Sequence, residues 1–247
     1  MRELRPGGRR GVAITALPLA LHTPDGFLSP GVAAVTGLVA IAVIAIALRA
    51  SERELTDARV PMLGVLAAFV FAAQMLNFPV AGGTSGHFVG AALAAVLLGP
   101  WLACVVLTVV IGVQAFGFAD GGIAALGANV LNMGILGALL AGFALTWGVR
   151  LLRPARGAFL VMVAGASWLA VMVGAGATAV ELAASGTVAL GTVLPAMLGV
   201  HVAIGIGEAA ITAAAVGAIL AGRPDLIAVG DLAPARGVAA SQPAGGT

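Results

Sequence analysis

The chain has very little charge for its length, and it contains no lysine. Only 9% of its 247 residues are charged, and every basic residue other than histidine is arginine. Without lysine there is no P-loop lysine to contact nucleotide phosphates, so this chain does not hydrolyse ATP by that route. The HExxH and GxSxG motifs are absent as well, which argues against an intramembrane protease, and no pattern of residues points to an enzyme.

Cysteine is almost as scarce, since Cys104 is the single one. One cysteine excludes an internal disulfide and every multi-cysteine zinc or iron–sulfur site. Cys104 lies inside an apolar run, where we expect it to be a small packing residue. The arginines occur in short clusters between apolar runs, which is the distribution of membrane topology signals, so we expect no nucleic-acid partner.

The composition predicts an all-α membrane protein. Hydrophobic residues make up 61% of the chain, which leaves too few charged residues to cover a soluble protein of this size. A helix needs about 20 mainly apolar residues to cross a bilayer. The sequence contains seven candidate segments, at residues 31–48, 60–77, 87–99, 101–118, 122–149, 158–183 and 192–221.

The arginines predict the orientation of these segments. They lie between segments one and two, between five and six, and after segment seven at Arg223. With seven helices these positions share one side, which the positive-inside rule assigns to the cytoplasm. We therefore expect a multi-pass protein of the cell membrane, with the amino terminus outside, the carboxyl terminus in the cytoplasm and a disordered tail over residues 223–247. His22 and the region of His87 then lie on the same, outer side.

The third segment is too short to cross the membrane. It has 13 residues, from His87 to Gly99, which is about 20 Å of helix against about 30 Å of hydrocarbon. His87 is therefore expected to lie below the outer surface. The preceding residues, NFPVAGGTSG at 77–86, are too rich in glycine and proline to form a regular helix. Irregular backbone at membrane depth is tolerated where it lines a cavity, so this connection is a candidate binding site.

Three histidines are candidate metal ligands. His87 follows the irregular connection directly, and an ionisable residue within a membrane is costly unless it has a function. His22, considered by itself, is most simply an ordinary loop residue. His201 is as consistent with an interhelical hydrogen bond as with metal ligation. Glu208 lies seven residues after His201, on the same helical face, and the two form a polar track, a network supporting the site or a packing contact.

Several other polar residues are expected to have structural roles. Asp120, in the turn FADGG, is expected to cap nearby backbone amides. Glu181 lies near a helix end and is expected to face water. Amide side chains in membrane bundles commonly bond between helices. Four are expected to do so here: Asn77, Gln114, Asn129 and Asn132.

Four stretches together resemble one known family. They are LHTPDGFLSP at 21–30, NFPVAGGTSGHFVGAALAAVLLGPW at 77–101, FADGGIAALGANVLNM at 118–133 and MLGVHVAIGIGEAAIT at 197–212. They resemble the CbiM/NikM family, the substrate-binding membrane components of energy-coupling factor transporters for cobalt and nickel. The resemblance extends from residue 21 to about residue 225.

This resemblance implies seven helices, with the amino terminus inserted into the bundle, and a near-planar metal site of four nitrogens. Carried over, Leu21 supplies the terminal amine, His22 its backbone amide and imidazole, and His87 the fourth nitrogen. Nitrogen ligands in a plane favour Ni(II)-like or Cu(II)-like ions over magnesium or calcium. The resemblance does not separate cobalt from nickel. Four further residues are candidates to support the ligands or line the pathway: Asn77, Ser85, His201 and Glu208.

The resemblance also implies partners. These are a transmembrane coupling subunit, cytoplasmic ATPase subunits and a small accessory membrane subunit as a separate chain. The cation is the transported substrate, and no cofactor is expected. The alternative is a stand-alone secondary transporter or channel in which His201 and Glu208 carry protons, and uptake in cells without the ATPase partners would favour it. A membrane enzyme is a third class, but the sequence shows no nucleophile and base pair for it.

The start of the chain departs from the family pattern. The family begins Met-His, whereas here Leu21 precedes His22 and 20 further residues precede Leu21. An internal peptide nitrogen cannot replace a free amine, and the arginines of residues 1–20 would lie outside, against the positive-inside trend. Translation starting at a leucine codon of position 21 removes the conflict, and so does a signal peptide cleaved after Ala20. Under either explanation we expect a working chain that begins at residue 21, with a membrane domain over residues 21–222. A third possibility is that residues 1–20 belong to the working protein and that the metal site is altered.

The turn Thr23-Pro24-Asp25-Gly26 has residues typical of tight turns. It is expected to fold the first two residues of the working chain back toward the bundle before the first helix begins at Pro30. Asp25 is then expected to form the turn and not to bind the metal.

Overall fold

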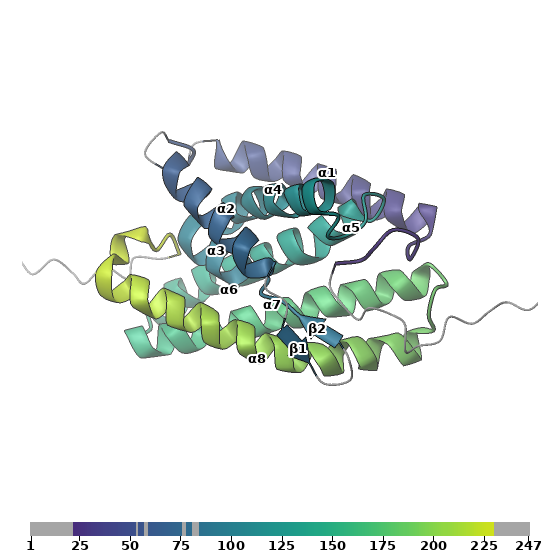
Figure 1. Cartoon of the computed structure of the whole chain (residues 1–247). Coiled ribbons are helices and arrows are strands. Elements are labelled where there is room, and N and C mark those ends of the chain that lie inside the picture. Colours follow the sequence, from purple (N-terminus) through teal and green to yellow (C-terminus); the bar gives the residue numbers. More distant parts are fainter. Residues whose placement is uncertain (1–21, 53, 57–58, 76–77, 81–83, 230–247) are drawn as a thin grey trace, which may run out of the picture.

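The computed structural model describes residues 22–52, 54–56, 59–75, 78–80 and 84–229. Its described part is a helical bundle with one short hairpin (Figure 1). The elements are α1 (Pro30–Ser51), α2 (Val60–Gln74), β1 (Phe78–Val80), β2 (Thr84–Gly86), α3 (Ala91–Leu98), α4 (Pro100–Phe118), α5 (Leu126–Asn129), the π-helical η2 (Val130–Leu136), α6 (Gly137–Leu152), α7 (Arg156–Ala184), α8 (Leu190–Gly222) and the 3₁₀ turn η3 (Pro224–Leu226).

Each of the seven predicted segments overlaps a helix, and the fifth overlaps α5, η2 and α6, which form one continuous helix from Leu126 to Leu152. Five of the helices are long and apolar enough to cross a membrane, so the prediction of a helical, multi-pass membrane protein is confirmed. The other two, α2 with 15 residues and α3 with 8, are each too short to span about 30 Å. Together with the hairpin they enter the bundle and return.

The helix boundaries follow the signals in the sequence. Ser29 caps α1, because its hydroxyl accepts a hydrogen bond from the amide of Val32 at 3.4 Å, and Pro30 is the first helical residue. Between α3 and α4 the chain reverses at Gly99, whose φ of 84° is the left-handed region that glycine adopts without strain. Pro100 then begins α4.

The glycine-rich connection is a small hairpin. Strands β1 and β2 pair antiparallel, with Phe78 opposite Gly86, and the hairpin lies against the middle part of α8 (Figure 1). The prediction that this connection is not helical is confirmed, although the strand pairing was not expected. Strand pairing satisfies backbone groups that lipid could not. The hairpin delivers His87 directly to the start of the short segment that leads into α3.

Helix α3 forms the centre of the core. All eight of its side chains are apolar and buried, and it packs against α4, α6, α7 and α8. A helix that is apolar all round is stable only when other helices surround it or lipid does. By contrast, α1 buries a narrow stripe, and its other side chains, such as Leu38 and Ile41, are exposed in the way that suits a lipid-facing surface.

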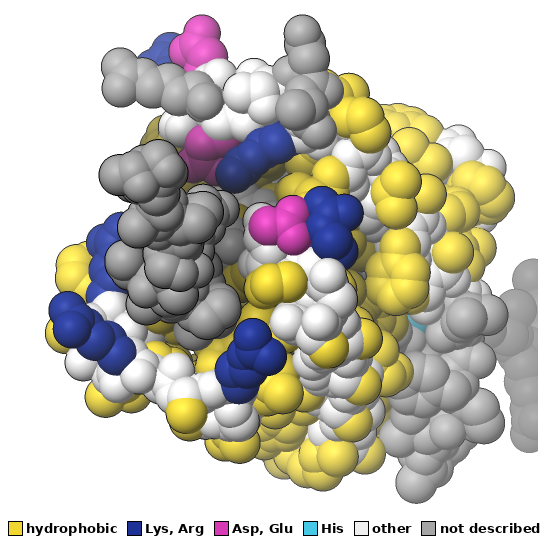
Figure 2. Space-filling model, turned by 90° about the vertical axis from the view of Figure 1, so that its left-hand side faces the viewer, with side chains coloured by type: hydrophobic (Ala, Val, Ile, Leu, Met, Phe, Trp, Pro, Cys, Tyr) yellow, Lys and Arg dark blue, Asp and Glu magenta, His cyan; other side chains and the backbone are white. Residues whose placement is uncertain are grey.

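The arginines of the described residues gather at one end of the bundle (Figure 2). The opposite end carries the start of α1 and the turn between α7 and α8 (Figure 1). This segregation agrees with the topology predicted from the sequence, in which the arginine end faces the cytoplasm. The described arginines at this end are Arg49, Arg59, Arg150, Arg153, Arg156 and Arg223.

Part of the predicted disordered tail packs on the bundle. Residues 224–226 form η3, and Ile227 and Val229 are buried. The amides of Ala228 and Val229 donate to the carbonyl of Val96 at 2.8 and 3.3 Å, which lies near the end of α3. The expectation of disorder from residue 223 is therefore wrong for residues 223–229, and residues 230–247 lie outside the described part.

Two other expectations concern buried side chains. Cys104 is fully buried, and its thiol contacts the carbonyl of Pro100 at 3.2 Å, so its packing role is confirmed. Glu181 was expected to face water, but only 8% of its surface is exposed, and its carboxylate accepts a hydrogen bond from the Asn132 amide at 2.7 Å. On α7 this side chain points toward η2. Its position near the end of the helix did not predict that direction.

Candidate metal centre

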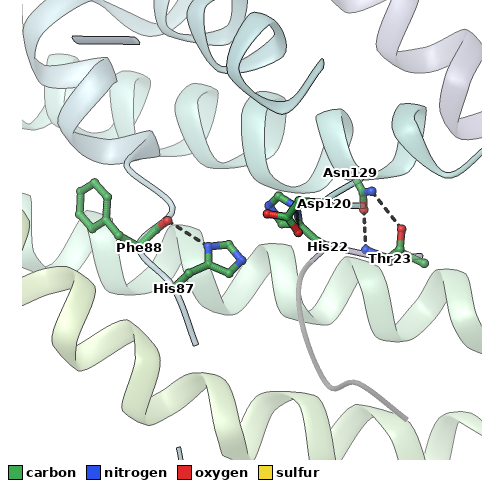
Figure 3. Close-up of polar contacts among 6 residues, drawn as sticks. All are labelled: His22, Thr23, His87, Phe88, Asp120 and Asn129. Carbon is green, nitrogen blue, oxygen red and sulfur yellow. Dashed lines mark hydrogen bonds and ion pairs between the residues drawn. The ribbon is translucent and has the colours of Figure 1, made fainter. Parts of the chain in front are cut away.

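Two buried histidines face each other inside the bundle. His22 lies at the start of the described chain, before α1, and His87 follows β2; only 6% and 8% of their surfaces are exposed. Their ring centroids are 4.8 Å apart, and the ring planes are nearly perpendicular at 89°. Figure 3 shows the ring of His87 pointing toward His22. The fold thus brings together two imidazoles that are 65 positions apart in the sequence.

The orientation of His87 leaves one nitrogen free. Its Nδ1 lies 3.0 Å from the carbonyl oxygen of Phe88, and because a carbonyl can only accept, this contact assigns the proton of the neutral ring to Nδ1. Its Nε2 then carries a lone pair. That atom is buried and has no hydrogen-bond partner among the described residues. A neutral imidazole whose other nitrogen is held by a carbonyl is the usual form of a histidine metal ligand.

The ring of His22 lies beside a carboxylate. Its Nδ1 is 3.3 Å from Oδ1 of Asp120, in the loop after α4, and both ring nitrogens are buried without a hydrogen-bond partner among the described residues. The contact with His22 holds the pKa of the Asp120 carboxyl below its usual value, in spite of the opposing effect of partial burial. The expectation that Asp120 caps backbone amides is not met. Its carboxylate instead places a negative charge beside the two imidazoles.

The segment that carries His22 is held by hydrogen bonds to Thr23 (Figure 3). The amide of Thr23 donates to Oδ1 of Asn129 at 2.8 Å, and Nδ2 of Asn129 donates to the Thr23 carbonyl at 3.1 Å. The amide of Gly122 donates to the same carbonyl at 2.9 Å. Asn129 was expected to bond between helices, but it holds the amino-terminal segment.

Asp25, two residues after Thr23, also joins this segment to the rest of the protein. It lies in the predicted turn, and its carboxylate accepts hydrogen bonds from the amides of Ile123 and Ala124 at 3.2 and 2.8 Å. These amides precede α5, so the loop between α4 and α5 binds the amino-terminal segment at several points. Gly121 in this loop has a φ of 87°, and a Cβ there would lie 2.9 Å from Nδ2 of Asn129. The loop therefore requires glycine at this position.

The segment that carries His87 is held from two helices. Glu208 on α8 is 3% exposed, and its two carboxylate oxygens accept hydrogen bonds from the amides of Val89 and Gly90, both at 2.8 Å. From α2, Nε2 of Gln74 donates to the carbonyl of Val89 at 2.7 Å. Of the three roles that the sequence left open for Glu208, this geometry favours support of the site.

The other predicted residues lie apart from this pair or outside the described chain. His201 is buried, and its Nδ1 contacts the carbonyl of Met197 in its own helix at 2.7 Å. Leu21 and Asn77 lie outside the described residues, and Ser85 is described only by its backbone, in β2. Within the described ranges, no group of three or more histidine, cysteine, aspartate or glutamate side chains is placed to hold a metal. Side chains alone thus offer two candidate ligands, the imidazoles of His22 and His87.

Four residues near the site had no site role in the sequence analysis: Asp25, Gln74, Asp120 and Asn129. A signal was present for Asp25, Asp120 and Asn129, because they lie inside the stretches 21–30 and 118–133 that carry the family resemblance, whereas Gln74 lies outside the four stretches. The pairing of the first and third stretches across about 100 positions depends on the fold, which the motifs do not contain.

The architecture and the site define a class: a multi-pass helical membrane protein whose amino-terminal segment enters the bundle and buries an imidazole against a second one. Comparison with known proteins makes this more specific. Residues 22–226 match the model of the CbiM family, described as the cobalt uptake substrate-specific transmembrane region.

Relatives and solved structures agree with the family match. The chain is 44% identical to a putative metal transport protein of Haloquadratum walsbyi over 84% of its own length and 93% of the relative's. It is 39% identical to a putative fused nickel transport protein NikMN of Archaeoglobus fulgidus, over 84% of this chain and 68% of that one. It is 33% identical to the cobalt transport protein CbiM of Sorangium cellulosum, over 84% and 94%.

A crystal structure of a truncated transition metal transporter superposes with a TM-score of 0.73 at 33% identity, covering 81% of this chain and 98% of that one. The chain therefore belongs to the CbiM family of cobalt and nickel transport proteins.

Proposed function

We propose that this chain is the substrate-capture membrane subunit of an energy-coupling factor transporter that imports Co²⁺ or Ni²⁺. The ligands are the amine at position 21, the backbone amide and imidazole of His22, and the imidazole of His87. The observation that carries the proposal is the pair of buried imidazoles, with ring centroids 4.8 Å apart. Nδ1 of His22, the ring nitrogen that can bind the same ion as the His22 amide, and Nε2 of His87 both lack a hydrogen-bond partner among the described residues.

The chemistry of this donor set suits a late first-row transition metal. Imidazole nitrogens bind such ions well, whereas magnesium and calcium prefer oxygen. A buried nitrogen without a hydrogen-bond partner is unfavourable, and a bound cation supplies the missing interaction. The relatives carry both cobalt and nickel in their names, and either ion is compatible with nitrogen ligands.

The energy for transport comes from other subunits in this proposal. The chain has no lysine, so it lacks the P-loop of a transport ATPase. We propose that it works with a transmembrane coupling subunit, cytoplasmic ATPases and a small accessory membrane subunit. The cation is the substrate, and the proposal includes no cofactor.

The geometry gives little support to a proton-coupled secondary transporter. Such a mechanism would use His201 and Glu208 as proton carriers. Both oxygens of Glu208 accept hydrogen bonds from backbone amides of the segment after His87, and Nδ1 of His201 contacts its own helix. Among the described contacts, no hydrogen bond joins these two side chains.

The first test is intact mass and amino-terminal sequencing of the protein purified from its native membranes. A chain that begins at position 21 would have the required amine, whereas a chain that begins at Met1 would contradict the four-nitrogen site. The second test is titration with Co²⁺ and Ni²⁺. His22→Ala and His87→Ala should each weaken binding by more than the roughly 10–100-fold that loss of a supporting contact costs. His201→Ala should bind normally.

A further inference from the structure

We infer that Glu208 is the positioning residue for the metal site, because its carboxylate on α8 fixes the backbone that orients His87. This inference rests on the proposed function. It assigns to α8 a direct part in setting the coordination geometry, although α8 supplies none of the proposed ligands.

The Glu208 carboxylate forms hydrogen bonds with two successive peptide groups. Its oxygens accept from the amides of Val89 and Gly90, each at 2.8 Å, across almost 120 positions of sequence. Gly90 has a φ of 77° and immediately precedes α3. Successive amides around a left-handed residue form a concave anion-binding nest, and the amides at a helix start carry a positive partial charge. An anionic side chain is therefore the matching partner for this backbone.

The same backbone is held from its other side. Nε2 of Gln74 on α2 donates to the carbonyl of Val89 at 2.7 Å, so both the amide and the carbonyl of Val89 are bound by buried side chains of different helices. A Cβ on Gly90 would approach Phe88 and Val70 to 2.9 and 3.1 Å. The segment thus has little room to shift while the carboxylate is in place.

The two hydrogen bonds of Glu208, here called the clamp, are separated from the proposed ligand His87 by a single residue, Phe88. Nδ1 of His87 lies 3.0 Å from the carbonyl of Phe88, and Phe88 is joined directly to the clamped Val89. The backbone held by Glu208 therefore sets the direction in which Nε2 of His87 points. Productive ligand geometry requires positions within about 0.5 Å and angles within about 10–20°. A small movement of this backbone would take Nε2 out of the plane of the other nitrogens.

Glu208→Gln is expected to remove one of the two hydrogen bonds of the clamp. The glutamine has one carbonyl oxygen to accept a hydrogen bond, and its NH₂ group cannot accept one. Either the amide of Val89 or that of Gly90 then loses its partner. The segment is expected to rotate toward the bond that remains, and Nε2 of His87 moves with it.

The chain provides a matched control. Glu181 on α7 is also a buried carboxylate, but it accepts a hydrogen bond from the side chain of Asn132, and no described hydrogen bond joins it to the His87 segment. Glu181→Gln makes the same chemical change in the same bundle. A loss that came only from removing a buried negative charge would appear in both variants.

The experiment uses the full chain in detergent, Ni²⁺ as the probe, and four variants: Glu208→Gln, Glu208→Asp, Glu181→Gln and His87→Ala. We measure the affinity and the visible ligand-field absorption of bound Ni²⁺, because the absorption reports coordination geometry in the folded, loaded fraction. Glu208→Gln should weaken binding by roughly 10–100-fold and shift the absorption. Glu181→Gln should change neither quantity.

The possible outcomes separate this inference from the proposed function. If His87→Ala loses binding while Glu208→Gln keeps both affinity and spectrum, the inference is overturned and the function stands. If His87→Ala binds Ni²⁺ like the unaltered chain, the proposed site itself fails. If Glu208→Gln does not fold, Glu208→Asp decides, because it keeps the charge and both acceptor oxygens but is one methylene shorter. An unchanged spectrum in that variant would overturn the inference.

Discussion

Replacing Asn129 with alanine should release the amino-terminal segment from the bundle. Asn129 is fully buried, and its side chain bonds both the amide and the carbonyl of Thr23, which is itself 3% exposed. The carbonyl keeps a second donor, the amide of Gly122. The Thr23 amide has only Asn129 as its partner among the described contacts, so in the variant it is left buried and unpaired or must move into water.

The expected loss of docking free energy follows from that single unpaired amide. A buried donor without a partner costs about 1–3 kcal/mol, which is a factor of about 5–150 in the docking equilibrium of the segment. Hydrogen–deuterium exchange of the peptide containing residues 22–29 measures this equilibrium without any metal. Affinity for Ni²⁺ should fall by up to the same factor, because His22 is presented only when the segment is docked.

Asn132→Ala is the matched control. Asn132 is equally buried and lies three positions further along the same continuous helix, but it donates to Thr178 and Glu181 on α7. It should leave exchange of residues 22–29 unchanged. Equal exchange and equal affinity in Asn129→Ala and the unaltered chain would refute the docking argument.

Three further predictions concern the surroundings of the site. Gly121→Ala should lower stability by about 1–2 kcal/mol, because alanine is strained at this φ and its Cβ would crowd Asn129; Gly31→Ala, where a Cβ meets nothing within 4 Å, is the control in thermal unfolding. Affinity for Ni²⁺ should decrease as the pH falls, because imidazole must lose its proton to bind metal. The pKa of Asp120 is lowered, so its carboxylate stays charged in weakly acidic solution, and Asp120→Asn should weaken binding at neutral pH without abolishing the pH dependence in the same titration. Truncation after residue 226 should lower the melting temperature relative to truncation after residue 229, because only the longer chain keeps the hydrogen bonds to Val96.

The two histidine segments are stabilised by the same combination of side chains. The segment before α1 is joined to the bundle by one carboxylate and one amide side chain: its own Asp25 accepts from the amides of Ile123 and Ala124, and Asn129 binds Thr23. The segment before α3 is bound by Glu208 and Gln74. Irregular backbone inside a membrane protein must satisfy its amides and carbonyls within the protein, since lipid offers no partners. These four side chains provide that satisfaction and at the same time restrict where the two imidazoles lie.

The sequence alone determined the helical segments and the arginine-bearing end, and it singled out His87 as a candidate ligand. Apolar run length reports directly on helices in a membrane, and glycine and proline mark their ends, so these features are local. The 13-residue third segment was informative for the same reason, because its length was incompatible with a full crossing. The second and third helices proved shorter than the runs that contain them, since the chain between them turns back in a hairpin.

Only the tertiary structure decided which polar groups meet. Glu208 contacts backbone amides almost 120 positions away, Asp120 faces His22, and Glu181 is turned inward against Asn132. Periodicity shows which face of a helix is apolar, but it does not show which helix packs on that face or how a loop enters between two of them. The partners of these buried polar side chains depend on the packing of the whole bundle, and so does the meeting of the two imidazoles.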